Sequence, residues 1–141
     1  MDDTHRLLDH LLATLVYRTQ KALRGAPPSF GSFSAGQGVR TPQDLVRHMS
    51  AVLNHARAFL GGPTRLNPLP THEEEVARFF EVAQHLRDRL AAHPLPAGTT
   101  PERLVQGPLS DALTHAGQLA LLRRLAGAPI PPENFHDATI E

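Results

Sequence analysis

The chain has 141 residues, and its 14 lysines and arginines balance 14 aspartates and glutamates, so the formal net charge is zero. This length allows one domain with a substantial core and leaves no room for a second, so residues 1–141 are expected to form a single domain. The balanced charge and the scattered arginines argue against nucleic acid as a partner. Because cysteine is absent, disulfides and thiolate chemistry are excluded, and any metal must be held by histidine, aspartate or glutamate.

The apolar runs of the sequence are all far shorter than the roughly 20 residues that a membrane-spanning helix needs, so no membrane partner is expected. The first four residues, Met-Asp-Asp-Thr, are acidic and polar, whereas a secretory signal is basic and then apolar. We therefore expect a cytoplasmic location. Nine histidines are unusual beside an aromatic content of 5%, and most of them are expected at the surface.

The first predicted helix spans Thr4 to Arg24. Its apolar residues recur with the i, i+1, i+4, i+5 spacing of an amphipathic helix, and they are Leu7, Leu8, Leu11, Leu12, Leu15 and Val16. Glycine and proline end this helix, and residues 25–40 form a long loop. Phe30 and Phe33 are expected to attach the loop to the helices, and the loop could also cover a cavity.

A second helix is predicted after the sequence Thr-Pro-Gln-Asp at 41–44, where threonine suits the N-cap, proline the first turn and aspartate the positive end of the helix. The residues of its apolar face are Leu45, Met49, Val52, Leu53, Ala56, Phe59 and Leu60. His48 and His55 are about 20° apart at the flank of this face, so both could point into a groove beside a neighbouring helix. The helix is expected to end at 61–63, Gly-Gly-Pro.

The third helix is predicted to follow a proline-rich connector, because Thr71 and Glu74 form a capping-box pattern. Its expected inward residues are Val76, Phe79, Phe80, Ala83, Leu86 and Leu90. His72, His85 and His93 do not share that face, so all three are expected to be exposed to solvent.

A short helical turn at 100–106 leads into the fourth long helix, predicted at 108–127, with Pro108 in its first turn and Gly127 just past its end. One stripe of this helix, within about 80° at 100° per residue, contains Asp111, His115, Gln118, Leu122 and Leu125, with Leu119 at its edge. Polar side chains on a core-directed stripe need partners, because an unpaired buried polar group costs a few kcal/mol. The stripe is therefore a candidate site.

The tail after residue 127 has three prolines in the four positions 129–132, so it is expected to run extended over the surface. No alternating strand pattern occurs anywhere. Four long amphipathic helices, each with one apolar face, predict an all-α four-helix bundle, with a long loop between the first two helices. In such bundles the space between facing helices holds metals and cofactors.

Asp111 and His115 are one helical turn apart, a spacing that lets two side chains converge on one ion. The third ligand must come from another helix, with His48 as first choice and His55 as the alternative. Two histidines and one carboxylate leave open positions on Zn, Ni, Mn or Fe. Gln118, one turn further along, could contact a bound cofactor, ligand or water.

A structural interpretation stays open beside the metal site. Asp111 and His115 could simply bond to each other, to His48 or to arginines inside the bundle. Serine catalysis at Ser110 is not expected, because the sequence has no Gly-x-Ser-x-Gly elbow. The pair Arg123-Arg124 suits the negative end of the helix dipole, although one of them could reach an anionic ligand or the tail.

Two stretches of the chain are Thr-Pro-Gln-Asp-Leu-Val-Arg-His-Met at 41–49 and Asp-Ala-Leu-Thr-His-Ala-Gly-Gln-Leu at 111–119, with Leu-Arg-Arg-Leu-Ala-Gly-Ala-Pro after the latter at 122–129. Together they resemble the DinB/YfiT-like superfamily of metal-binding four-helix bundles. Members typically hold a divalent metal with one histidine of the second helix and a His-x-x-x-His pair of the last. By resemblance His48 matches the first ligand and His115 the second of the pair. Asp111 replaces the remaining histidine, and a carboxylate favours a different metal.

The resemblance implies a small enzyme in which the metal activates a low-molecular-weight thiol or water, as in a thiol transferase or a hydrolase, acting on a small-molecule substrate. Other members are associated with DNA-damage induction. The alternative function is therefore a non-catalytic, stress-associated binding or scaffold protein with a hydrogen-bonded polar core and no metal. Because relatives are often dimers, a homodimer is also expected, with Ile130 and Phe135 of the tail lying across the partner.

Overall fold

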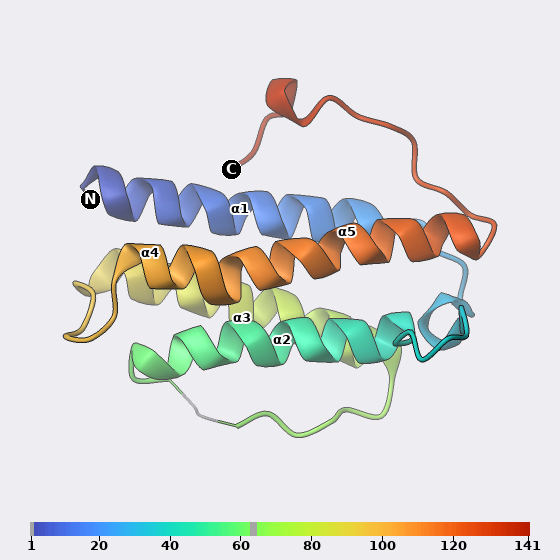
Figure 1. Cartoon of the computed structure of the whole chain (residues 1–141), viewed down its shortest axis with the longest axis horizontal. Helices are drawn as coiled ribbons and strands as arrows, with labels where there is room; N and C mark the ends of the chain where they lie inside the picture. The colour runs from blue at the N-terminus through green and yellow to red at the C-terminus, as the bar shows by residue number, and fades with distance from the viewer. Residues whose placement is uncertain (1, 63–64) are drawn as a thin grey trace.

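The computed structural model describes residues 2–62 and 65–141. Four long helices lie side by side in it (Figure 1), and they are α1 (Asp3–Leu23), α2 (Pro42–Phe59), α3 (His72–Ala92) and α5 (Ser110–Leu125). The short elements are η1 (Phe30–Ser32), α4 (Pro101–Leu104), η2 (Val105–Leu109) and η3 (Phe135–Asp137). No strand occurs in the described ranges, so the expectation of an all-helical chain with four long helices is confirmed.

The helix starts follow the local signals of the sequence. The hydroxyls of Thr41, Thr71 and Thr100 each accept a hydrogen bond from the backbone N–H three residues later, at 3.3, 3.1 and 3.2 Å. Each bond satisfies one of the N–H groups that a helix start leaves without a partner. Pro63, expected to help end the second helix, and Met1, in the polar N-terminal segment, lie outside the described residues.

Helices α2 and α3 run in the same direction. Three contacts between them or their ends join residues 28, 28 and 29 positions apart, and a constant separation along the chain is the mark of parallel neighbours. The pairs are Arg47 with Glu75, Arg57 with His85 and Leu60 with Arg89. The connector between α2 and α3 therefore returns the chain to the end where α2 began, and α5 lies beside α1 in the direction of α1 (Figure 1).

The fourth long helix begins at a kink, in agreement with the expected start at Pro108. Gly107 has non-helical angles of φ −96° and ψ −105°, and this kink, which η2 spans, separates the short helix α4 from α5. Pro108 has no N–H to donate and directly follows the kink, where a helix start leaves N–H groups without a helical partner. Gly127, with φ +81°, follows the end of α5 as expected.

Most of the predicted apolar faces form the core. Its fully buried large side chains include Leu12, Met49, Leu53, Phe79, Leu86 and Leu119. Leu7, Phe59 and Leu125 were wrongly expected to face inward, and they are 60%, 53% and 56% exposed. Each lies at the edge of its stripe or in the last turn of its helix, beyond the cover of a neighbouring helix. None of the helices in the described ranges has both the length and the apolar character that a membrane span requires.

Two histidines of α3 are less exposed than expected. His85 Nδ1 lies 2.9 Å from an Arg57 guanidinium nitrogen. The His72 ring packs edge-on against buried Phe30, with centroids 6.4 Å apart, and burial lowers the pKa of His72. A Cβ at Gly31 would lie 2.5 Å from His72 Cγ, so only glycine allows this approach. The loop between α1 and α2 is thereby fixed against the start of α3.

Candidate metal centre

Helices α2 and α5 bring three potential ligands together. His48 comes from α2, and Asp111 and His115 come from successive turns of α5; one ligand atom of each lies within 4.8 Å of the others. The two imidazole rings meet edge-on, with centroids 4.7 Å apart and an interplanar angle of 82°. The three residues singled out in the sequence therefore form one cluster.

The cluster has a buried side and an open side. His115 Nε2 lies 3.1 Å from Asp111 Oδ1, as expected for residues one helical turn apart. The His115 side chain is only 10% exposed, whereas the Asp111 side chain is 48% exposed. A buried imidazole beside a half-exposed carboxylate leaves the cluster accessible from solvent on the carboxylate side.

Gln118 contacts the other nitrogen of the His115 ring. Its Oε1 lies 2.8 Å from His115 Nδ1, so it accepts a hydrogen bond when Nδ1 is protonated. In that tautomer Nε2 carries a lone pair and faces Asp111 Oδ1, which is also an acceptor. Two acceptors this close repel one another unless a cation lies between them. Either a proton or a metal ion can fill that role.

The charge state of His48 suits a ligand. Burial lowers the pKa of His48, and the positive charge of Arg40 and the neighbouring His115 lower it further, against an opposing effect of Asp111. The imidazole is therefore neutral at pH 7 and has a lone pair to donate. Metal binding requires this form, because a protonated imidazole cannot coordinate.

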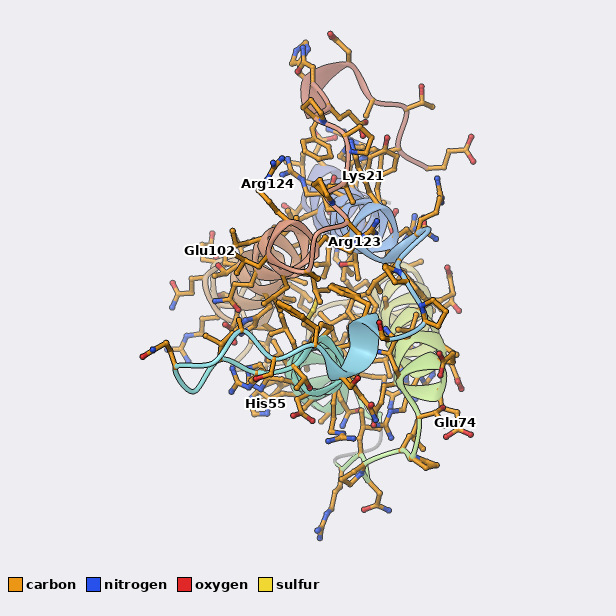
Figure 2. The ribbon with its side chains drawn as sticks, turned by 90° about the vertical axis from the view of Figure 1, so that its right-hand side faces the viewer. Lys21, His55, Glu74, Glu102, Arg123 and Arg124 are labelled. Carbon is orange, nitrogen blue, oxygen red and sulfur yellow. The ribbon has the colours of Figure 1, made fainter. Side chains whose placement is uncertain are left out.

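His55, the alternative third ligand, does not join the cluster. Its side chain is exposed (Figure 2), and its ring packs against Phe59 with centroids 5.0 Å apart. The angular position of His55 matches that of His48, but seven residues of helix separate them by about 10 Å along the axis. Angular agreement alone could not distinguish the two histidines, and the axial displacement excludes His55.

A cavity of about 550 Å³ lies beside the cluster, under the loop that precedes α2. Gln118 lines it together with Arg40 and Val39 of the loop and Leu121 and Leu125 of α5. The sequence suggested that this loop could cover a cavity, but Arg40 was not identified as part of the site. Its proximity to His48 depends on the path of the loop, which no periodic pattern indicates.

Comparison of the chain with protein-family models, with curated proteins and with solved structures found no match. The class of protein is therefore defined by its geometry, as an all-helical chain with a two-histidine, one-carboxylate cluster that could hold a metal ion.

Proposed function

We propose that the chain binds a divalent metal ion through His48, Asp111 and His115, as a member of the DinB/YfiT-like superfamily. The observation that carries the proposal is the environment of His115, which has an oxygen acceptor at each ring nitrogen and a neutral imidazole beside it. A cation between Asp111 and His115 removes the repulsion between the two acceptors. Hydrogen bonding to Gln118 then keeps Nε2 directed at the ion.

The donor set agrees with the distances that such a site needs. Ligands that bind Zn²⁺ tetrahedrally at about 2.0–2.2 Å lie about 3.3–3.6 Å from one another. The 3.1 Å between His115 Nε2 and Asp111 Oδ1 is close to that separation, and all three ligand atoms lie within 4.8 Å. A small rotation of the half-exposed Asp111 side chain or of the His48 side chain would bring all three ligand atoms within coordinating distance of one ion. Zn²⁺, Mn²⁺, Fe²⁺ and Ni²⁺ all accept two imidazoles and one carboxylate.

The proposed activity is that of a thiol transferase or a hydrolase acting on a small molecule. A divalent ion with three protein ligands supplies Lewis acidity to a bound thiol or water at its open positions. Gln118 orients the His115 ring and fixes its tautomer. Arg40, at the wall of the adjacent cavity, provides a positive charge for an anionic part of a substrate.

Metal binding should be stoichiometric and should depend on the cluster. Protein purified without a histidine tag is expected to bind about one equivalent of Zn²⁺ or Mn²⁺, and His115→Ala should weaken binding at least 100-fold by removing a ligand. Elemental analysis and titration calorimetry measure this. His55→Ala is the matched control, because it removes an exposed histidine of α2 outside the cluster. Equal, sub-stoichiometric metal in wild type and His115→Ala would refute the proposal.

A second candidate function is a non-catalytic binding or scaffold role, and one observation favours it. If the Gln118 amide is reversed, its NH₂ donates to His115 Nδ1, and His115 Nε2–H donates to Asp111 Oδ1. Every polar group of the stripe then has a partner without an ion. In this case the stripe only stabilises the contact between α2 and α5.

Thermal unfolding with and without chelator distinguishes the two functions. A metal present at 100 times its dissociation constant stabilises the folded state by about 2.7 kcal/mol, since the unfolded chain does not form the site. For a chain of this size the melting temperature should fall by about 8 °C when chelator removes the metal. An unchanged melting temperature, with ¹⁵N NMR showing the Nε2–H tautomer of His115, would favour the scaffold.

A further inference from the structure

The C-terminal tail is fastened across α1. It leaves α5, crosses to the outer side of α1 (Figure 1), and has no regular structure before η3. Glu133 accepts hydrogen bonds from the Tyr17 hydroxyl and from Lys21 Nζ, the latter at 2.6 Å. The Phe135 ring meets Tyr17 edge-on, and the Arg18 guanidinium lies 3.9 Å from the centre of the Phe135 ring. The tail is thus held by hydrogen bonds, an ion pair and a stacked cation.

A cavity of about 690 Å³ lies between this tail, α1 and α5. Its floor is apolar and consists of Leu11, Leu113, Ala116, Gly117 and Ala120. A Cβ added at Gly117 would have no atom within 4 Å, so the floor is open at this position. At 100° per residue, these residues of α5 lie on roughly the opposite side of the helix from the metal cluster. The cavity is therefore separate from the candidate metal centre.

The charges around this cavity are unbalanced. Arg18, Lys21 and Arg124 line it, and Glu133 is its one acidic residue. Glu133 already pairs with Lys21, whereas among the described residues neither Arg18 nor Arg124 has a carboxylate within 4.0 Å. Lys21 and Arg124 both lie on the side of the bundle that faces the tail (Figure 2). The Arg124 guanidinium and the in-plane N–H groups of Arg18, whose face stacks on Phe135, are left to bind an anion.

The cavity continues along α1 as an apolar groove. A second cavity, of about 680 Å³, shares Leu11 and Thr14 with the first and extends to Leu7 and Val105. Leu7 is 60% exposed and Val105 39% exposed, so this end offers apolar surface. From Leu7 to Arg18 the groove follows about 16 Å of helix, at 1.5 Å per residue. It is cationic at one end and mainly apolar at the other, where the lining also includes Glu102, His10 and Gln106.

We propose that this groove binds an aliphatic carboxylic acid, with its carboxylate between Arg18 and Arg124 and its alkyl chain along α1 toward Leu7 and Val105. Guanidinium groups recognise carboxylates through paired hydrogen bonds. The apolar floor excludes a polyanion, which would need cations along its whole length. The tail residues from Ile130 to Phe135 cover the carboxylate end, so the ligand enters from the apolar end.

Titration calorimetry with dodecanoate, kept below its micelle concentration, tests the proposal on the full chain. We expect saturable one-to-one binding, with dodecanol at least about tenfold weaker because it lacks the charge. The double variant Arg18→Ala/Arg124→Ala should weaken dodecanoate binding at least about tenfold. Arg65→Ala/Arg103→Ala, which removes two exposed arginines outside the groove and changes net charge equally, should leave it unchanged.

Gly117→Leu supplies a second, independent variant. The added side chain enters the open floor without a clash at its Cβ, so the fold and its melting temperature should be retained while dodecanoate binding is lost. Absence of saturable dodecanoate binding to the wild type, or equal affinity in Gly117→Leu, overturns the proposal. A third outcome also overturns the proposal: light scattering shows a dimer, Leu7→Glu dissociates this dimer, and the dimer binds no dodecanoate. In that case a second copy of the chain occupies the groove.

Discussion

Replacing Glu75 with alanine is expected to lower the free energy of unfolding by about 3–5 kcal/mol, the cost of breaking a buried ion pair by removing one partner. The Glu75 side chain is fully buried and accepts hydrogen bonds from Arg47 Nε at 2.9 Å, Arg78 Nη2 at 2.9 Å and the Leu69 N–H at 2.6 Å. One carboxylate therefore joins α2, α3 and the connector. The expected fall in melting temperature is about 10 °C or more.

Glu74→Ala is the matched control for this prediction. Glu74 precedes Glu75 in the first turn of α3, but its side chain is exposed and points away from the bundle (Figure 2). Its removal loses only a favourable interaction with the helix dipole, about 0.3–1 kcal/mol. Denaturant unfolding of both variants measures the difference. Equal destabilisation by the two substitutions would show that burial of Glu75 has no special role.

The same carboxylate gives stability a defined dependence on pH. Burial alone would raise the pKa of Glu75, but the hydrogen bonds from Leu69 and Arg47 and the charge of Arg78 hold it below its ordinary value of 4.5. Its contribution is therefore fully present above pH 4.5 and is lost as the pH falls through the lowered pKa. Glu75→Ala should unfold with a flatter pH dependence below 4.5 than the wild type.

Arg123→Ala is expected to destabilise the chain by about 3 kcal/mol, because charged hydrogen bonds to three carbonyls are lost together. Arg123 is 5% exposed and donates to the carbonyl oxygens of Ala22 at 3.0 Å, Arg24 at 2.9 Å and Ala128 at 2.8 Å. It thereby joins the end of α1 to the end of α5. The sequence favoured a helix-dipole role for the Arg123-Arg124 pair and left open that one of them reaches the tail, and Arg123 does so at the carbonyl of Ala128.

The neighbouring Arg124 provides the comparison for Arg123. Arg124→Ala removes an exposed arginine of the same turn, and its effect on stability should stay within about 0.5 kcal/mol. Arg123→Lys should recover only part of the loss, since an ammonium group cannot reproduce the planar fork that reaches separate carbonyls. Full recovery by lysine would show that charge alone, and not the carbonyl contacts, carries the effect.

Much of the fold was predictable because its signals are local. Threonine caps set the starts of α2, α3 and α4, with proline in the first turn of α2 and α4, and the 3.6-residue period located most of the core. Gly107 and Pro108 also mark the kink at which the fourth long helix begins, because glycine tolerates non-helical angles and proline suits a first turn. Local signals failed at the edges of the apolar stripes, where Leu7 and Leu125 lie on predicted faces but are exposed because no neighbouring helix covers them.

The candidate site was also predictable only in part, where its residues share one helix. Helical periodicity places Asp111 and His115 together, since both lie on one helix. The choice of His48 over His55 as the third ligand depends on the axial position of α2 relative to α5, and this position is a property of the tertiary structure. Glu75 was missed entirely because its neighbours Glu73 and Glu74 have the same sequence context, whereas its partners come from α2 and the connector. No pattern within α3 distinguishes the buried glutamate.

The parallel course of α2 and α3 also bears on the order in which the chain folds. Their contacts close loops of about 28 residues, whereas Arg123 and Ala22 close one of 101. The longer closure costs about 1 kcal/mol more entropy, so α2 and α3 should pair early and α1 and α5 late. Loss of Arg123 should then accelerate unfolding and leave the folding rate nearly unchanged. The α1–α5 seam, the last to form, is the first expected to open.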